Sequence, residues 1–211
     1  GSVSWGDTGG ADRPDRGEAG SPNGIGAVAM GVAIEALIDL GFDEMLQHEI
    51  ELGGRLLKSL RDIPGVAVLG GIGSGQERLG LASFVIDGVH HGLAAAALSH
   101  EWGVAVRNGC FCANPYVFHL LNMSRQDVEK VEGEVAADRR TALPGAVRAS
   151  LAPYNDEAEV DRFADAVRRV ASGQLKTRYE QADDGTFAPE GGWPAIPNPL
   201  ESLAKRGALK I

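Results

Sequence analysis

Both cysteines of the chain lie in one short stretch, Val104-Ala-Val-Arg-Asn-Gly-Cys-Phe-Cys-Ala-Asn-Pro115, and an arginine precedes them. The apolar half of this stretch, Val104 to Arg107, predicts a strand that ends at Asn108-Gly109. Cys110 and Cys112 would then lie in the following loop, where a thiol close to a cation can act as a nucleophile. The alternative is that both thiols are small buried apolar side chains, as cysteines in reduced proteins commonly are.

The spacing of the two cysteines bears on disulfide and metal chemistry. One residue separates Cys110 from Cys112, which is a poor geometry for a disulfide between them. With no other cysteine in the chain, a reducing, cytoplasmic compartment is expected. A metal site would need further ligands, and the adjacent His90 and His91 would point in different directions on a helix. We therefore predict no metal site.

Length, charge and hydropathy restrict the class of protein. The 211 residues include 23% charged and 44% hydrophobic residues, as in an ordinary soluble globular protein. A net charge of -9 argues against nucleic acid and anionic membranes as main partners. The sequence shows no apolar run of membrane-spanning length, and its first residues do not have the pattern of a signal peptide.

The chain divides into three parts by composition. Residues 1–23 are rich in glycine, aspartate, arginine and proline and indicate a connector without regular structure. Residues 24–172 carry the periodic patterns of an α/β domain, a small mixed sheet covered by helices. Residues 173–211 form an extension interrupted by proline and glycine, which we expect to wrap over a surface of the domain.

Within the central part, helical and strand patterns alternate. The expected helices are 25–36, which ends before Gly41, and 46–60, 91–102, 124–139 and a last one that begins at Asn155. The expected strands are 66–69, 81–86, 104–107 and 146–151. In the last of these strands Val147 and Ala149 would face the core, so that Arg148 and Ser150 would face the other way.

Three motifs in this order resemble landmarks of the class V aminotransferase fold. They are Glu18-Ala-Gly-Ser-Pro-Asn23, Arg107-x-Gly-x-x-Cys-Ala113, and Val147-Arg-Ala-Ser-Leu-x-x-Tyr-Asn155 followed by Glu159-Val-Asp161. More narrowly, they resemble the group II cysteine desulfurases and selenocysteine lyases, which use pyridoxal phosphate. The resemblance covers about residues 16–172 and implies the small C-terminal domain of a fold type I pyridoxal-phosphate enzyme.

The resemblance also implies a role for three residues. Cys112 matches the cysteine that attacks the substrate's sulfur and carries it as a persulfide. Arg148 matches the arginine that binds the carboxylate of a small amino-acid substrate, a task that suits a bidentate donor. Ser21 stands where the family usually has a threonine that helps to bind the cofactor phosphate, and Ser21-Pro22 would also suit the start of a helix. A homodimer and a protein that accepts the sulfur are implied as partners.

Two departures from the family pattern limit what the resemblance implies. Close desulfurases have a histidine in place of Cys110, and they have a shorter gap than the 36 residues from Cys112 to Arg148. The extra length here includes the polar helix expected over 124–139, as in more distant relatives such as molybdenum cofactor sulfurases. The family's cofactor-binding lysine belongs to a large domain, which we expect on a missing segment or on a separate chain. The alternatives are another reaction of the same fold, such as transamination, epimerisation or C–S cleavage, and a non-catalytic module. We expect the chain alone to be inactive.

Overall fold

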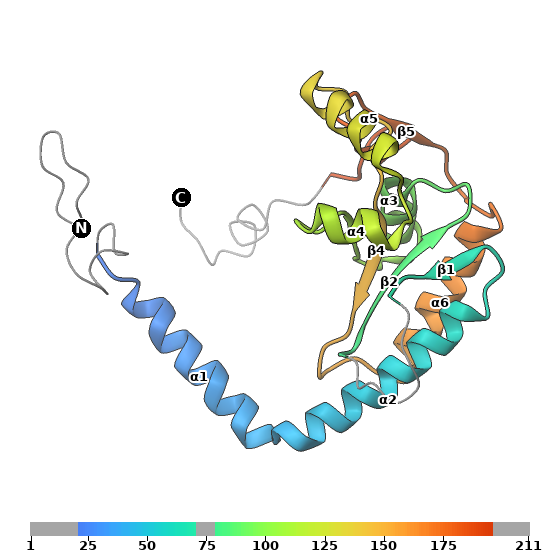
Figure 1. Ribbon diagram of the computed structural model, residues 1–211. Coiled ribbons are helices and arrows are strands. Elements are labelled where there is room, and N and C mark those ends of the chain that lie inside the picture. Colours follow the sequence, from blue (N-terminus) through green and yellow to red (C-terminus); the bar gives the residue numbers. More distant parts are fainter. Residues whose placement is uncertain (1–20, 71–78, 196–211) are drawn as a thin grey trace, which may run out of the picture. The chain divides into compact units, whose positions relative to one another are not determined.

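The computed structural model describes residues 21–70 and 79–195. The chain forms two units, residues 1–47 and residues 48–211, and each is described by itself. The elements in chain order are α1 (Gly24–Leu40), α2 (Phe42–Arg61), β1 (Val66–Val68), β2 (Leu81–Ile86), α3 (His91–Trp102), β3 (Arg107–Gly109), α4 (Asn114–Leu120), α5 (Arg125–Ala136), β4 (Ala146–Ser150), α6 (Glu157–Ala171), β5 (Tyr179–Gln181) and β6 (Phe187–Pro189) (Figure 1).

The first unit contains α1, which begins after an asparagine cap. The Asn23 side chain accepts a hydrogen bond of 2.9 Å from the backbone N–H of Gly26. Asn23, and not the Ser21 that the sequence favoured, is therefore the N-cap, because its side chain reaches the free N–H groups of the first turn. Apolar side chains such as Ile25, Val28 and Met30 are exposed on this helix.

No single helix among the described residues has both the length and the hydropathy that a membrane span needs. The helices α1 and α2 meet the requirements only when they are taken together as a bent pair.

The second unit is built on a four-stranded sheet in the order β1-β2-β4-β3, and every neighbouring pair is antiparallel. We expected a mixed sheet, and the pairing shows why that expectation was wrong. The α3 crossover makes β2 and β3 parallel to each other, as a helical connection usually does. The strand β4 then lies between them and runs against both, so that the two parallel strands never form a pair.

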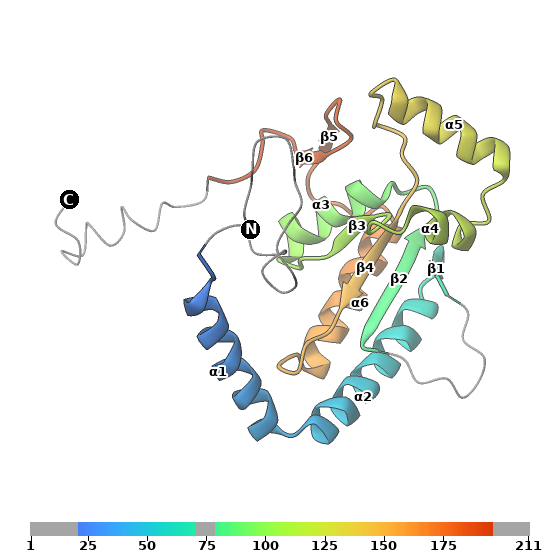
Figure 2. The same ribbon diagram turned by 60° about the vertical axis from the view of Figure 1, so that its left-hand side comes forward.

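The helices cover one face of this sheet. Alternate residues of the two central strands, Phe84 on β2 and Val147 on β4, are buried against α3, α6 and the second half of α2 (Figure 2). The buried stripe of α6 contains Val160, Phe163, Ala164, Val167 and Val170, as the sequence predicted. Since side chains alternate along a strand, Arg148 belongs to the opposite face, also as predicted.

Two local boundaries differ from the sequence predictions. The third strand is β3 (Arg107–Gly109) and not 104–107, because the Val104 N–H bonds back to the Leu98 carbonyl at the end of α3. The chain therefore reaches pairing distance from β4 only at Arg107. The last helix is capped by Asp156 and not by Asn155. The Asp156 carboxylate accepts from the Glu159 backbone N–H, and the Glu159 carboxylate accepts from the Asp156 backbone N–H, which is a capping box.

The extension after α6 packs on α3, as expected for the described residues 173–195. It forms the antiparallel pair β5–β6, and β6 lies against α3. The carboxylate of Glu101 on α3 accepts hydrogen bonds from the backbone N–H groups of Lys176 and Thr177 and from the Tyr179 hydroxyl. Burial and the Glu101 charge raise the pKa of Tyr179, so this hydroxyl stays a donor. The half-buried Glu101 carboxylate thus attaches the start of the extension to α3.

Candidate functional site

The two cysteines lie on a tight turn that connects β3 to α4. The Ala113 N–H donates a 2.8 Å hydrogen bond to the Cys110 carbonyl, which closes a four-residue turn. Its central residues, Phe111 and Cys112, have φ angles of 56° and 59°. Both values lie in the left-handed region that turns usually fill with asparagine and glycine. A bulky residue held there is strained, and such strain concentrates at functional sites.

The turn gives its two thiols different surroundings. Cys110 is half-buried, and its Sγ donates a hydrogen bond of 3.2 Å to the Pro144 carbonyl. Burial also raises the pKa of the Cys110 thiol. Cys112 is exposed. Because the thiolate is the reactive form of cysteine, this difference favours Cys112 as the nucleophile.

We expect alkylation to distinguish the two thiols. At neutral pH with limiting iodoacetamide, Cys112 should react at least about tenfold faster than Cys110, because Cys112 is exposed while burial raises the pKa of the Cys110 thiol. Labelling of Cys110 should rise only at more alkaline pH, since its raised pKa delays formation of the thiolate. Peptide mapping measures both rates. Faster labelling of Cys110 at neutral pH would contradict the assignment.

Arg148 lies beside this turn, and no acidic side chain of residues 21–70 or 79–195 pairs with its charge. Its guanidinium carbon lies over the Phe111 ring, 5.1 Å from the ring centre, which is a cation–π contact. Its Nε is buried and has no hydrogen-bond partner among the described residues. A buried N–H without a partner is costly, so this group is arranged for an acceptor that comes from outside the described part of the chain.

A histidine on α3 holds the backbone behind the turn. His91 lies with Nδ1 3.2 Å from Asn108 Oδ1 on β3 and with Nε2 3.1 Å from the Leu143 carbonyl before β4. Gly145 follows, and a Cβ on it would lie 2.6 Å from both Gly109 Cα and His91 Cδ2. Distances this short leave no room for a side chain. The close approach of Gly145 to Gly109 therefore sets the position of the cysteine turn relative to β4.

The variant Gly145→Ala should reduce stability, because Gly109 is backbone and cannot move aside without breaking the β3–β4 pairing. We expect the free energy of unfolding in urea to fall by about 1–3 kcal/mol. The control is Gly133→Ala on α5, where a Cβ meets nothing within 4 Å. This change should raise the stability by about 0.5–1 kcal/mol, since alanine is the better helix former. Equal effects of the two variants would contradict the close packing at Gly145.

Ser21, the third predicted site residue, belongs to the first unit. It lies exposed in the segment before α1. The motif partners Glu18, Ala19 and Gly20 lie outside the described residues. Of the predicted site residues, Cys112 and Arg148 are near one another, because Arg148 lies over the ring of Phe111, the residue before Cys112. Ser21 belongs to the other unit.

The residues after β4 have structural partners. Asn155 accepts a hydrogen bond from the Ala152 N–H and donates one to Glu159, while Asp161 forms a two-bond ion pair with Arg55 on α2. The Arg55 guanidinium lowers the pKa of Asp161. These contacts join α6 to β4 and α2. The motif residues Asn155, Glu159 and Asp161 therefore support the fold, whereas the Arg148 side chain has no such partner among the described residues.

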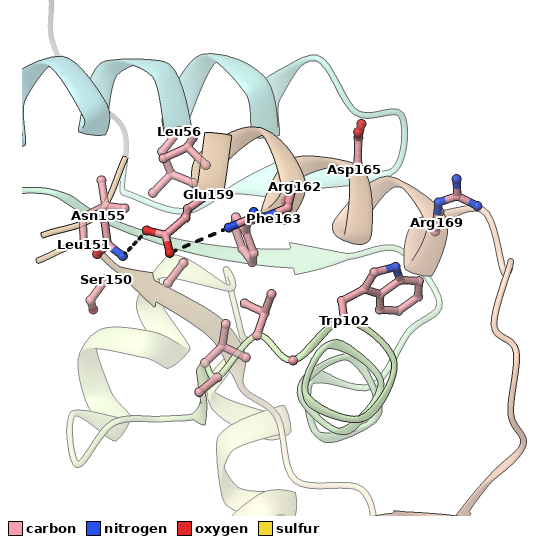
Figure 3. Close-up of a pocket in the computed structure, with 16 residues that line it drawn as sticks. Leu56, Trp102, Ser150, Leu151, Asn155, Glu159, Arg162, Phe163, Asp165 and Arg169 are labelled. Atoms are coloured by element: carbon pink, nitrogen blue, oxygen red, sulfur yellow. Dashed lines mark hydrogen bonds and ion pairs between the residues drawn. The ribbon is translucent and has the colours of Figure 1, made fainter. Parts of the chain in front are cut away.

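A separate cavity of about 540 Å³ lies between α6 and the segment that leads into β3. Figure 3 shows Glu159 between Asn155 and Arg162 on one wall, with Trp102 nearer the end of α3. Neither Cys112 nor Arg148 lines this cavity. It is therefore distinct from the site formed by the cysteine turn and β4.

The described residues fit part of a pyridoxal-phosphate site. Arg148, with its unpaired Nε, fits the carboxylate of a substrate. The lysines Lys58, Lys130 and Lys176 lie on α2, on α5 and after α6, and not on the elements that carry Arg148 and Cys112. The described chain thus offers the substrate side of such a site and not a lysine to anchor the cofactor. No group of three or more metal-ligating side chains is positioned to hold an ion among the residues described.

The chain is similar over part of its length to known cysteine desulfurases. A protein of Pseudomonas putida named probable cysteine desulfurase is 37% identical over 150 residues, which are 71% of this chain and 31% of that protein. The crystal structure of the cysteine desulfurase CsdA of Escherichia coli has a TM-score of 0.54 at 28% identity, over 75% of this chain and 33% of that one. An apo cysteine desulfurase structure from Thermococcus onnurineus NA1 has a TM-score of 0.60 at 26% identity, over 77% and 35%.

Each of these matches covers only about a third of the related protein. The chain spans about a third of the length of the curated relatives that it matches. The fold is that of part of a fold type I pyridoxal-phosphate enzyme. The model of the family named aminotransferase class-V matches residues 2–163, which is more than half of the sequence. The chain therefore belongs to the class V aminotransferase family.

Proposed function

We propose that this chain supplies the substrate-binding arginine and the sulfur-accepting cysteine of a pyridoxal-phosphate-dependent cysteine desulfurase. The observation that carries the proposal is the arrangement of Arg148 beside the strained turn that exposes Cys112. Arg148 binds the carboxylate of the amino acid through its paired N–H groups. Ser21 contributes to the binding of the cofactor phosphate.

The thiolate of Cys112 performs the sulfur transfer. Its sulfur attacks the sulfur of the bound cysteine and forms an S–S bond while the Cβ–S bond of the substrate breaks. The electron pair of the broken bond stays with the substrate carbon, which takes a proton to become alanine, and Cys112 keeps the sulfur as a persulfide. Pyridoxal phosphate, when bound, supplies the electron sink for this chemistry. Exposure of Cys112 then allows an acceptor protein to remove the sulfur.

The alternatives are other reactions of the family and a module without catalysis. The relatives named above are cysteine desulfurases, which favours sulfur transfer over transamination, epimerisation or another lyase reaction. The two thiols are free, which suits a reducing, cytoplasmic compartment.

Partners are proposed on the same basis. The helix α1 is apolar around its circumference and has no buried residue. A helix of this composition is normally enclosed by protein. We propose that the cofactor domain, on the same or on another chain, and a second copy in a homodimer supply that enclosure.

The test is the activity of the complete gene product that contains this chain. Purified with pyridoxal phosphate and a reductant, it should convert cysteine to alanine and release one sulfide for each alanine. Alanine measured by chromatography and sulfide measured by colour formation give the ratio. Formation of a keto acid without sulfide would indicate transamination, and no conversion would favour the non-catalytic module. Either outcome would overturn the proposal.

A further inference from the structure

A second arginine stands directly opposite Arg148. In the pairing of β3 with β4, Arg107 and Arg148 are partners in the register, and Ser83 on β2 is the partner of Arg148 on its other side. Residues directly opposite one another in an antiparallel pair project from the same face of the sheet. Ser83, Arg148 and Arg107 therefore form a row across three strands, on the face that the core helices do not cover.

Neither arginine side chain has a counter-charge within the described part of the chain. Like charges directly opposite on neighbouring strands destabilise a sheet. Several other arginines of this acidic protein pair with carboxylates, as Arg55 does with Asp161 and Arg139 with Glu134. Among the described residues, neither the Arg107 nor the Arg148 side chain forms a hydrogen bond or an ion pair, although the chain has 29 acidic residues. Two opposed arginines without a neutralising carboxylate indicate that the negative charge they need comes from a ligand.

We propose that Arg107 and Arg148 together form a binding site for a small dianion of the dicarboxylate type. Each guanidinium presents a planar fork that matches one carboxylate. The Arg148 guanidinium also lies over the Phe111 ring, with its carbon 5.1 Å from the ring centre. Opposed residues in such a strand pair have Cα atoms roughly 4.5–5.5 Å apart. That spacing suits two acidic groups joined by a short carbon chain.

This inference rests on the proposed function for the Arg148 end of the site. Arg148 would bind the carboxylate that a substrate amino acid also offers, and Arg107 would bind the second acidic group. A dicarboxylate would therefore compete with the amino acid for Arg148 and act as an inhibitor. Arg107 is exposed, so the second position is open to solvent.

The test uses the whole 211-residue chain, titrated with malonate and, separately, with acetate at low salt and followed by NMR chemical shifts. We expect malonate to bind at least about tenfold more tightly than acetate, because it engages a second charge-assisted fork. Arg107→Gln should weaken malonate binding to the level of acetate and leave acetate unchanged. Arg148→Gln should weaken both. The control Arg125→Gln, at a side chain that is 92% exposed on α5, should change neither.

The outcomes separate the two proposals. If malonate and acetate bind alike and both depend on Arg148, the dianion site is wrong, while Arg148 remains a carboxylate site. The site is also wrong if Arg107→Gln leaves malonate binding unchanged. A purely structural Arg107 would instead show itself as a loss of thermal stability in Arg107→Gln. We expect no such loss, because the change removes repulsion between like charges.

Discussion

Replacing Cys112 by serine in the complete protein is expected to abolish the release of sulfide from cysteine. A hydroxyl is far less nucleophilic than a thiolate at neutral pH, and an oxygen at this position cannot hold sulfur as a persulfide. We expect a loss of about a thousandfold or more, within the range seen when an enzyme loses its nucleophile. Binding of the amino acid should change little, because the carboxylate contact belongs to Arg148.

The matched control is Cys110→Ser, two residues away on the same turn. A serine hydroxyl can still donate to the Pro144 carbonyl, as the Cys110 thiol does. We therefore expect Cys110→Ser to keep most of the activity and most of the stability. Mass spectrometry of the protein after reaction with cysteine should show the added sulfur on Cys112 only. An active Cys112→Ser variant, or a persulfide on Cys110, would refute the role of Cys112.

The sequence predicts the larger elements of the fold because their patterns are local. The helix α1 ends at Leu40 before Gly41, as expected from the apolar period and the glycine. The strand β2 occupies 81–86, as its alternation predicts, and α6 has the expected buried stripe. The hydrophobic period alone determines each of these elements.

Shorter elements depend on contacts that the sequence does not display. The strand β3 contains Asn108 and Gly109, which locally favour a turn, because pairing with β4 overrides that preference. The short helix α4 and the pair β5–β6 were not predicted, since three to seven residues give no period to recognise. The polar helix expected over 124–139 is the shorter α5, which ends at Ala136.

The candidate site shows the same division. Cys112 and Arg148 could be proposed from motifs, and whether they act as proposed remains a prediction. Arg107 was seen as a cation near the cysteines, but its position opposite Arg148 follows from a register between strands that are distant in the chain. The positive φ angles of Phe111 and Cys112 could not be predicted from the sequence either, because neither residue type favours a left-handed turn.

Changing Arg148 to lysine in the complete protein should weaken binding of the amino-acid substrate by about 1.5–3 kcal/mol. This corresponds to about one to two powers of ten in affinity. Lysine keeps the positive charge but loses the planar fork that binds both carboxylate oxygens, and it removes the guanidinium that lies over the Phe111 ring. The loss should appear as a raised KM for cysteine and a smaller change in kcat.

Stability distinguishes this explanation from a structural one. Since Arg148 has no hydrogen bond or ion pair among the described residues, removal of its guanidinium breaks no contact of that kind within the fold. Urea unfolding of Arg148→Lys should therefore differ from that of the unchanged protein by less than about 1 kcal/mol, the size of a surface substitution. The control Arg125→Lys, on exposed α5, should alter neither KM nor stability. If Arg148→Lys unfolds the domain while KM in the folded fraction stays the same, the arginine supports the sheet and does not bind the substrate.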